Sequence, residues 1–520
     1  MTIPIETDPD VVSRFLEDAA HYPGGNAAGV MRPRSIDEMS ACLREQRRIL
    51  PVGAQSSLTG GATPLGDVVL STERLTTVTI EPAHIRVGAG VTLEAVQRAL
   101  QGAGRWFPPV PTYLGATVGG AIATCAAGAA TFKYGSVRPW VDAITVVLAG
   151  GDILEIKRGE VFASSEGIFE IKTDSGIRTV RIPPLEMPAV EKHSAGYYCA
   201  PEMDLIDLFI GSEGTLGVIA EAVLRTAPER GPVVRALVQL SSEAEAMALV
   251  DHLRNNADED YSSGNPFGLD VAAIEHMDAR SLAVVQEDGV DRKLHIAIRP
   301  DTAVMLLIEI ELRHNDRGRE LWPEFQDALD DDAPDTPVRR LVQLLDEWDA
   351  LDTTEIAMPS DEARARAFAE LREAVPAGVN RRVALAQQQI DPRISKTAAD
   401  MIVPFDRFGD MMRICRSLFA ERGLDLAVWG HISDGNVHPN VIPRSAEDVK
   451  QGQEAILVLG AEVIGMGGCP LAEHGVGRSA IKQELLRQLY GSGGVDAMRA
   501  LKLSLDPDGL LAPGVIFPSQ

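Results

Sequence analysis

The sequence has an excess of acidic over basic residues. Its 520 residues include 49 Lys and Arg against 75 Asp and Glu, a formal net charge of −26. Nucleic acids and anionic membrane surfaces are bound by basic faces, so this balance argues against both as partners. A solvated acidic surface is the simplest explanation of the charge, and docking of a basic partner is the alternative.

Several sequence features of other protein classes are missing. No Cys-x-x-Cys occurs, which leaves no evident zinc knuckle, iron–sulfur cluster or redox dithiol. No run of about 18 apolar residues is present, so no membrane span is predicted. The acidic N-terminus lacks the basic start and apolar core of a signal peptide. We expect a cytoplasmic protein with reduced cysteines; they are Cys42, Cys125, Cys199, Cys415 and Cys469.

The length predicts two or three domains. Up to Pro228 the pattern is α/β without a regular βαβ repeat. After Pro228 it changes to longer strands and charged helices, which indicates a separate α+β domain. Helices are expected over 8–21, 35–49, 93–100, 243–255, 361–375 and 408–422, and strands over 50–52, 67–71, 78–80, 218–224, 233–240 and 304–312. A β-rich excursion is expected over 153–188.

Pro51–Gly61 holds three glycines and three hydroxyl residues. Glycine lets the main chain turn sharply and approach a ligand closely. Consecutive N–H groups in such a turn form a concave nest for an anion, usually a phosphate. A plain connection between elements is the simpler interpretation of this segment taken alone.

Two further segments are rich in small residues. Ala116–Gly128 consists almost entirely of small side chains, which is typical of a close helix or strand crossing or of a surface against a flat ligand. Gly211–Gly217 is a third glycine loop and leads into an expected strand.

Histidines are concentrated near the C-terminal end. His431 and His438 lie seven residues apart around an Asp-Gly-Asn turn, and Glu473-His474 follows. Two histidines and one carboxylate would leave open positions on Zn²⁺ or Fe²⁺ for a substrate. Isolated histidines are more often structural, and Glu473 could equally cap a helix.

Seven segments in order carry a family resemblance over nearly the whole chain. The chain resembles the flavoproteins of the vanillyl-alcohol oxidase and p-cresol methylhydroxylase superfamily. Within it, the chain is most similar to the D-lactate, D-2-hydroxyglutarate and glycolate dehydrogenases. The segments are Pro51–Gly61, Ala116–Gly128, Tyr134-Gly135, Gly211–Gly217, His431–His438, Glu473–Gly477 and Asp506–Gly514.

The resemblance implies an α+β protein. Its FAD-binding domain, of the p-cresol methylhydroxylase type with two subdomains, would span 1–228. A substrate or cap domain with an antiparallel sheet would span 229–459, and a C-terminal segment, 460–520, would return to the FAD-binding domain. A homodimer is left open.

The resemblance also implies the cofactor site. Covalently flavinylated members of the family carry a histidine in the first loop; here there is none, so we expect non-covalent FAD. The residues carried over as cofactor-binding are Pro51, Gly53, Ala54, Gln55, Ser56, Ser57, Gly60, Thr117, Gly119, Gly120, Thr124, Gly128, Glu213, Gly214, Ile219 and Asn436.

For the substrate site, the resemblance implies a divalent metal, most simply Zn²⁺, on His431, His438 and Glu473. His474 would be the base, Arg372 would bind the substrate carboxylate bidentately, and Asn440 would contact the substrate. Without the resemblance, the simplest interpretation of Arg372 is a solvated helix residue, and that of Asn440 is a turn residue. One departure is a lysine of the family pattern, whose position is taken by Ala398; Lys396 is a candidate substitute.

The implied reaction is FAD-dependent oxidation of a 2-hydroxyacid, of the D-lactate, D-2-hydroxyglutarate or glycolate type, to the 2-oxoacid. The metal would lower the pKa of the hydroxyl, His474 would take its proton, and hydride would pass to flavin N5. A quinone, cytochrome or electron-transfer flavoprotein would accept the electrons. Alternatives are a flavin-dependent transferase of the alkylglycerone-phosphate synthase type, whose His-x-His signature is absent here, and a non-catalytic flavin subunit, against which the intact His/Glu set argues.

Overall fold

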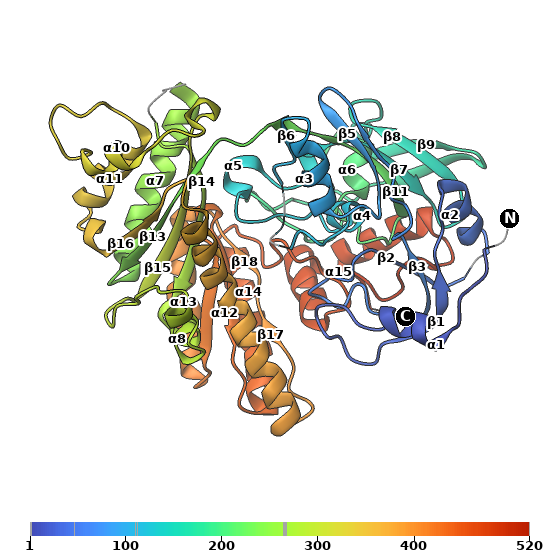
Figure 1. Ribbon diagram of the computed structural model, residues 1–520. Helices are drawn as coiled ribbons and strands as arrows, with labels where there is room; N and C mark the ends of the chain where they lie inside the picture. Colours follow the sequence, from blue (N-terminus) through green and yellow to red (C-terminus); the bar gives the residue numbers. More distant parts are fainter. Residues whose placement is uncertain (1–2, 46, 110, 112, 264–267, 519–520) are drawn as a thin grey trace. The chain divides into compact units, whose positions relative to one another are not determined.

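The computed structural model describes residues 3–45, 47–109, 111, 113–263 and 268–518 (Figure 1). The chain forms two compact units. The first comprises Met1–Gly128, Gly135–Pro228 and Cys469–Gln520; the second comprises Ala129–Tyr134 and Glu229–Gly468. The expected boundary at 460 is wrong, because it falls inside α14 (Ala446–Gly465), which packs on α13 (Phe408–Glu421) of the second unit.

One sheet of the first unit is parallel, with strand order β1-β3-β2. Its strands are β1 (Asn26–Met31), β2 (Ile49–Val52) and β3 (Leu65–Ser71). The crossover helix α2 (Ile36–Leu43) begins at Ser35, whose hydroxyl accepts a hydrogen bond from Glu38 N. It ends six residues before the expected position 49, because Ile49 is already in β2 and donates its N–H to Leu510 O.

The N-terminal helix is also shorter than expected. It consists of α1 (Pro9–Val12) and the 3₁₀ turn Ser13–Phe15, and stops well before residue 21. The backbone beyond it contacts the first glycine loop instead: Ala19 N donates to Gln55 O, and the buried Asp18 accepts from Ala62 N. A helix through residue 21 would leave these loop contacts unmade.

The second sheet of this unit is antiparallel, with strand order β4-β5-β11-β7-β8. Helices α3 (Leu93–Gln101), α4 (Val118–Ala123) and α6 (Leu205–Phe209) and the C-terminal helix α15 (Ala480–Leu505) complete the unit (Figure 1). The expected β-excursion forms β8 and the hairpin β9–β10. The strands are β4 (Val78–Ile80), β5 (His84–Gly88), β7 (Val141–Val147), β8 (Ile153–Lys157), β9 (Ile168–Thr173), β10 (Gly176–Arg181) and β11 (Val218–Arg225).

The second unit contains an eight-stranded sheet in which every pairing is antiparallel, as expected for this half of the chain. The order is β16-β13-β15-β14-β19-β20-β17, and β18 also pairs with β20. The strands are β13 (Val233–Leu240), β14 (Val271–Asp278), β15 (Val304–Glu311), β16 (Thr354–Ala357), β17 (Thr397–Ala398), β18 (Met401–Ile402), β19 (Leu426–His431) and β20 (Asn436–Val441).

One face of this sheet packs against α8 (Ala279–Glu287) and α12 (Glu362–Gln389). Met277 and Trp429 of the sheet share a buried core with Phe368 and Leu371 of α12. Helix α12 continues past the expected end at 375, and Pro376 lies inside it. Helix α7 (Glu243–Ser263) contacts β13, β14 and β15.

Residues 129–134 belong to the second unit because a cluster of charges holds them there. Lys133 Nζ lies 2.7 Å from Asp270 and 2.6 Å from Glu311, and Tyr134 Oη donates to Glu311 at 2.6 Å. Arg230 Nε donates to the same glutamate. This excursion of six residues out of the first unit was not expected from the sequence.

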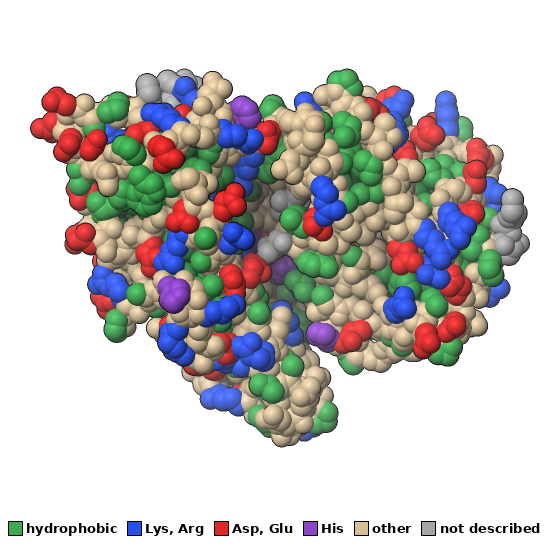
Figure 2. All heavy atoms as spheres, in the orientation of Figure 1, with side chains coloured by type: hydrophobic (Ala, Val, Ile, Leu, Met, Phe, Trp, Pro, Cys, Tyr) green, Lys and Arg blue, Asp and Glu red, His purple; other side chains and the backbone are tan. Residues whose placement is uncertain are grey.

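The acidic excess is visible on the surface. The segment between α10 (Trp322–Gln326) and α11 (Pro337–Glu347) exposes five aspartates, and acidic side chains gather over that part of the second unit (Figure 2). Among the described residues, no helix combines the length and apolarity needed to cross a membrane.

Candidate active site

The three glycine loops meet in the first unit. A Cβ on Gly53 would lie 2.2 Å from Thr117 Oγ1, and one on Gly214 would lie 3.2 Å from Pro51 Cγ. Glu213 N donates to Ala123 O at 2.7 Å. The first loop therefore touches both of the others, although about 60 and 160 residues separate them along the chain.

The first loop presents a row of backbone amides. Within the described chain, the N–H groups of Ala54, Gln55, Ser56 and Ser57 donate to no protein acceptor, and these residues are partly or fully exposed. Gln55 has a φ of +53°, a conformation that turns successive N–H groups toward one point. Its side-chain amide donates to Phe15 O, Glu17 O and Ala62 O. The Gln55 side chain thus holds the loop in place, and the backbone N–H groups of the loop are available to an anion.

Glu213 joins the third loop to the segment after His474. Its carboxylate accepts from Val476 N and Gly477 N, both at 2.8 Å. Burial raises the pKa of Glu213 to about 7, and the two amide bonds lower it only in part. Since Gly475 and Gly477 have φ values of +75° and +57°, the turn needs glycine at both positions. Glu213 therefore fixes the turn that carries His474.

Some predicted cofactor residues serve the packing of the unit. Gly119 allows α4 to approach β5, because a Cβ there would lie 2.7 Å from Ala89 Cβ. Thr124 Oγ1 donates to Gly120 O, and Gly60, with φ of +76°, lies against the Tyr22 ring. Ile219 is a β11 residue opposite Val146.

The two histidines predicted as metal ligands, His431 and His438, lie together in the second unit. In the antiparallel register, Glu275 faces His431 and Trp429 faces His438, which places all four side chains on the sheet face covered by α12. The His431 and His438 rings are 5.6 Å apart between centroids and nearly perpendicular. Both residues are buried, at 1% and 5% exposed.

Glycines shape the backbone just before His431 and in the turn between the two histidines. Gly430 has a φ of +155° and Gly435 a φ of +80°. A Cβ at Gly430 would lie 2.6 Å from Asn436 O, and one at Gly435 would lie 2.3 Å from Val403 O. The close approach of neighbouring backbone therefore requires glycine at both positions.

A buried carboxylate lies behind His431. Glu275 Oε1 is 3.0 Å from His431 Nδ1, and Arg372 Nε donates to Glu275 Oε2 at 3.0 Å. Burial alone would raise the pKa of Glu275, but Arg372 and His431 outweigh burial and lower the pKa to about 2. An ionised acceptor at Nδ1 favours the tautomer in which Nε2 carries the lone pair.

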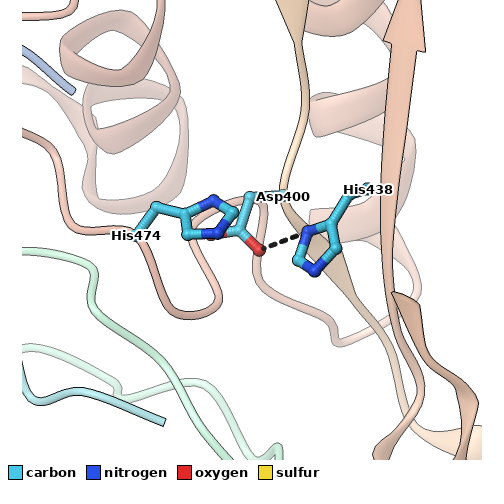
Figure 3. A group of neighbouring side chains, drawn as sticks. All are labelled: Asp400, His438 and His474. Atoms are coloured by element: carbon cyan, nitrogen blue, oxygen red, sulfur yellow. Dashed lines mark ion pairs between the residues drawn. The ribbon is translucent and has the colours of Figure 1, made fainter. Parts of the chain in front are cut away.

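A second buried carboxylate lies behind His438. Asp400 Oδ1 is 3.4 Å from His438 Nδ1 (Figure 3). Asn436 Nδ2 donates to Asp400 Oδ1 at 3.2 Å and to Met401 O at 2.9 Å. The side-chain amide of Asn436, predicted to contact the cofactor, therefore orients Asp400 within the second unit.

Two buried amide oxygens at this site accept no hydrogen bond from the described residues. They are Oδ1 of Asn436 and Oδ1 of Asn440, residues that are 0% and 2% exposed. Asn440 Nδ2 donates to His438 O at 2.9 Å. Because a buried acceptor without a donor costs about 1–3 kcal/mol, these oxygens suit a ligand that brings hydroxyl or N–H donors.

Arg372 extends from α12 to the same cluster and is 8% exposed. Besides Glu275, it contacts Glu373 Oε1 through Nη1 at 3.0 Å. It is a buried cation between the core residues Leu371 and Val375 of α12, which differs from a solvated helix arginine.

Glu473 and His474 lie in the first unit. Lys192 Nζ is 2.9 Å from Glu473 Oε2, and His474 Nε2 is 3.4 Å from Glu473 Oε1. The Glu473 side chain is 9% exposed and that of Lys192 only 1%. Glu473 is thus a buried carboxylate with a cationic neighbour, and no helix begins at it.

Ala398, at the position of the family lysine, pairs directly with Asn440 across β17 and β20. Lys396 lies two residues before it, just ahead of β17 (Thr397–Ala398). It stays a candidate substitute for the family lysine.

Comparison with known proteins identifies the family. A profile described as an FAD binding domain matches residues 27–157, and one described as the C-terminal domain of FAD linked oxidases matches residues 265–516. The chain belongs to the FAD-linked oxidases. It is an FAD-dependent oxidoreductase of the superfamily that its motifs predicted.

Curated relatives match this FAD-linked oxidase along nearly its whole length. D-lactate dehydrogenase of Archaeoglobus fulgidus is 27% identical, over 98% of this chain and 94% of its own. Glycolate oxidase subunit GlcD of Bacillus subtilis is 26% identical, over 94% and 88%. D-2-hydroxyglutarate dehydrogenase of Xanthomonas citri pv. viticola is 26% identical, over 99% and 94%.

The first unit of this FAD-linked oxidase fits its cofactor. The amides of residues 54–57 offer the anion contacts that a dinucleotide pyrophosphate requires, and the three loops around them leave those amides to a ligand. In this predicted binding loop the backbone N–H groups are available to a ligand, whereas the Gln55 side chain is bonded within the protein.

Three residues of this FAD-linked oxidase were missed as site residues. Glu275 stood out in the sequence as a charge within the apolar run Val271–Met277, and Asp400 belongs to a segment already noted. Lys192 carries no sequence signal, because only the fold brings it to Glu473.

Proposed function

We propose that the protein oxidises a 2-hydroxyacid to the 2-oxoacid, with non-covalent FAD and a divalent metal, most simply Zn²⁺. The observation that carries the proposal is the His431–His438 pair, with a buried carboxylate behind each Nδ1 and a buried arginine beside one of them. Carboxylate-backed histidines are the usual form of a metal-binding imidazole. The names of the relatives, which act on D-lactate, glycolate or D-2-hydroxyglutarate, agree with this assignment.

The proposed metal ligands are His431, His438 and Glu473. The donor set of two imidazoles and one carboxylate suits Zn²⁺ and leaves positions for a substrate. When bound, the metal supplies Lewis-acid chemistry at the substrate hydroxyl and FAD supplies two-electron acceptance. The two histidines contribute their Nε2 atoms, since their Nδ1 atoms are directed at Glu275 and Asp400.

The remaining residues bind the substrate and move its proton. Arg372 places a buried positive charge for the carboxylate, and Asn440 Oδ1 provides an acceptor for a hydroxyl. His474 takes the hydroxyl proton on a ring nitrogen; a histidine suits this step because its proton exchanges near neutral pH. A separate protein or quinone would then accept the electrons.

Anaerobic mixing with a panel of D- and L-2-hydroxyacids tests the proposal. At least one acid should bleach the flavin absorbance, and chelator-treated protein should bleach only after Zn²⁺ is restored. The variant H431A should lose bound metal and bleaching together while keeping FAD. A panel without bleaching, or full metal content in H431A, would contradict the proposal. Turnover of a phosphate-bearing substrate without bleaching would favour the transferase alternative.

A further inference from the structure

We infer that Glu275 is a positioning residue that orients both His431 and Arg372. It would hold one proposed metal ligand and the proposed carboxylate-binding arginine in register through a single carboxylate. The inference rests on the proposed function for the roles of His431 and Arg372. The contacts of Glu275 with His431 and Arg372 do not depend on that proposal.

The geometry is that of a bridge. Glu275 Oε1 lies 3.0 Å from His431 Nδ1, and Glu275 Oε2 accepts from Arg372 Nε at 3.0 Å. Glu275 and His431 are direct partners in the β14–β19 register, while Arg372 reaches the carboxylate from α12. One carboxylate therefore links the sheet to the helix within the buried face of α12, where Leu371 and Val375 flank Arg372 in the sequence.

Burial makes this bridge costly to break. Glu275 is 7% exposed, Arg372 8% and His431 1%. An ionised carboxylate in such a site persists only with partners that compensate its lost hydration. Leu371, which precedes Arg372, and Met277, two residues after Glu275 in β14, belong to the buried core of this unit. Neither the ring of His431 nor the guanidinium of Arg372 can turn without breaking its bond to Glu275.

For His431 the consequence is a fixed tautomer. An acceptor at Nδ1 retains the ring proton there and leaves the lone pair on Nε2, which is the form that binds a metal. His438 has a looser arrangement, with Asp400 at 3.4 Å. Loss of the Glu275 carboxylate should therefore impair metal binding through His431.

The bond to Glu275 also fixes the orientation of the Arg372 guanidinium. The bond at Nε orients the planar guanidinium, whose two Nη groups form the fork that matches a carboxylate. Glu373 also contacts Arg372, through Nη1, but its side chain is 49% exposed and it does not touch His431. Glu373 is thus a matched control, because it contacts Arg372 as Glu275 does but does not contact His431.

The test compares E275Q, E275D and E373Q in the FAD-loaded protein. Zn²⁺ affinity is measured by chelator competition, without turnover. E275Q should bind Zn²⁺ about 10–100-fold more weakly, the usual effect of losing a carboxylate behind a metal-binding histidine. E373Q should keep the wild-type affinity. E275Q should also raise KM for the bleaching hydroxyacid, since Arg372 loses its orientation.

Nitrogen-15 NMR of histidine-labelled, metal-free protein gives a second readout. The His431 signal, assigned by its loss in H431Q, should report a proton on Nδ1 in wild type and in E373Q, and a tautomer mixture in E275Q. This measurement needs neither metal nor substrate. It therefore separates failure of the inference from failure of the proposed function.

The outcomes are distinct. Unchanged Zn²⁺ affinity and an unchanged His431 tautomer in E275Q would overturn the inference. Wild type that binds no metal and is bleached by no hydroxyacid would overturn the proposed function, and the tautomer would still decide the role of Glu275. If E275Q loses FAD or no longer melts cooperatively, E275D replaces it in the test. Wild-type Zn²⁺ affinity and an unchanged His431 tautomer in E275D would overturn the inference. Weakened Zn²⁺ binding in E275D would support it.

Discussion

Lys192 Nζ lies 2.9 Å from Glu473 Oε2, with both side chains buried in the first unit. Glu473, the proposed third metal ligand, thus forms an ion pair with Lys192, which no sequence motif indicated. Removal of one member of a buried ion pair leaves the other charge without its partner, which is far more destabilising than loss of an exposed pair.

The substitution K192M should lower the free energy of unfolding by about 3–5 kcal/mol, measured by urea denaturation of the FAD-loaded protein. The double variant K192M/E473Q should recover part of that loss. K293M removes the exposed Lys293–Glu370 pair and should change stability by at most about 1 kcal/mol. Additive effects of the two changes in the double variant would contradict a direct interaction between Lys192 and Glu473.

Glu213 should give stability a pH dependence. Its pKa is raised from 4.5 to about 7 by burial, so the folded state binds the proton more tightly than the unfolded state. The free energy of unfolding should therefore fall as pH rises between about 4.5 and 7, by on the order of 2 kcal/mol. Denaturation across this range should show the slope in wild type and a smaller one in E213Q. Equal slopes would contradict the assignment.

Gly53→Ala should weaken FAD binding, because the new Cβ would lie 2.2 Å from Thr117 Oγ1 and displace the first loop from the second. We expect a loss of about tenfold in affinity, which is about 1.4 kcal/mol, measured by reconstitution of apoprotein. Gly102→Ala is the control: Gly102 has a φ of −64°, and its nearest neighbour to a Cβ is 3.7 Å away. Equal FAD affinity in both variants would show that the contact between the loops is dispensable.

His474→Ala should lower the rate of flavin bleaching by about 10²–10⁴-fold, the usual contribution of a positioned base, with FAD content unchanged. Stopped-flow absorbance under anaerobic conditions measures the rate. His314, an exposed residue of the second unit, provides the control H314A, which should bleach at the wild-type rate. A normal rate in H474A would remove His474 from the role of base.

Local features of the site were predictable from the sequence. The glycines at 53, 214 and 435 mark bends and turns that the structure contains, and apolar segments such as 233–240 and 304–312 predicted strands that form. The spacing of His431 and His438 across an Asp-Gly-Asn turn predicted two facing histidines, and their ring centroids are 5.6 Å apart. These features depend on residues near one another in the chain, where side-chain type and backbone freedom act directly.

Element ends were less predictable. The helix after Ser35 stops at Leu43 and the N-terminal helix at Phe15, because residues beyond them make long-range bonds to Leu510 and to the first glycine loop. Local propensity cannot anticipate such competition, since the partners lie tens to hundreds of residues away.

By itself, then, the sequence determined the FAD-linked oxidase family, the glycine loops and the candidate ligands, since each is written in short segments. Only the tertiary structure decided which charges meet: Glu275 with His431 and Arg372, Lys192 with Glu473, and Lys133 with Glu311. The physical reason is burial. An ionised group removed from water requires a compensating partner. Strand register and helix packing determine which residue is close enough to be that partner.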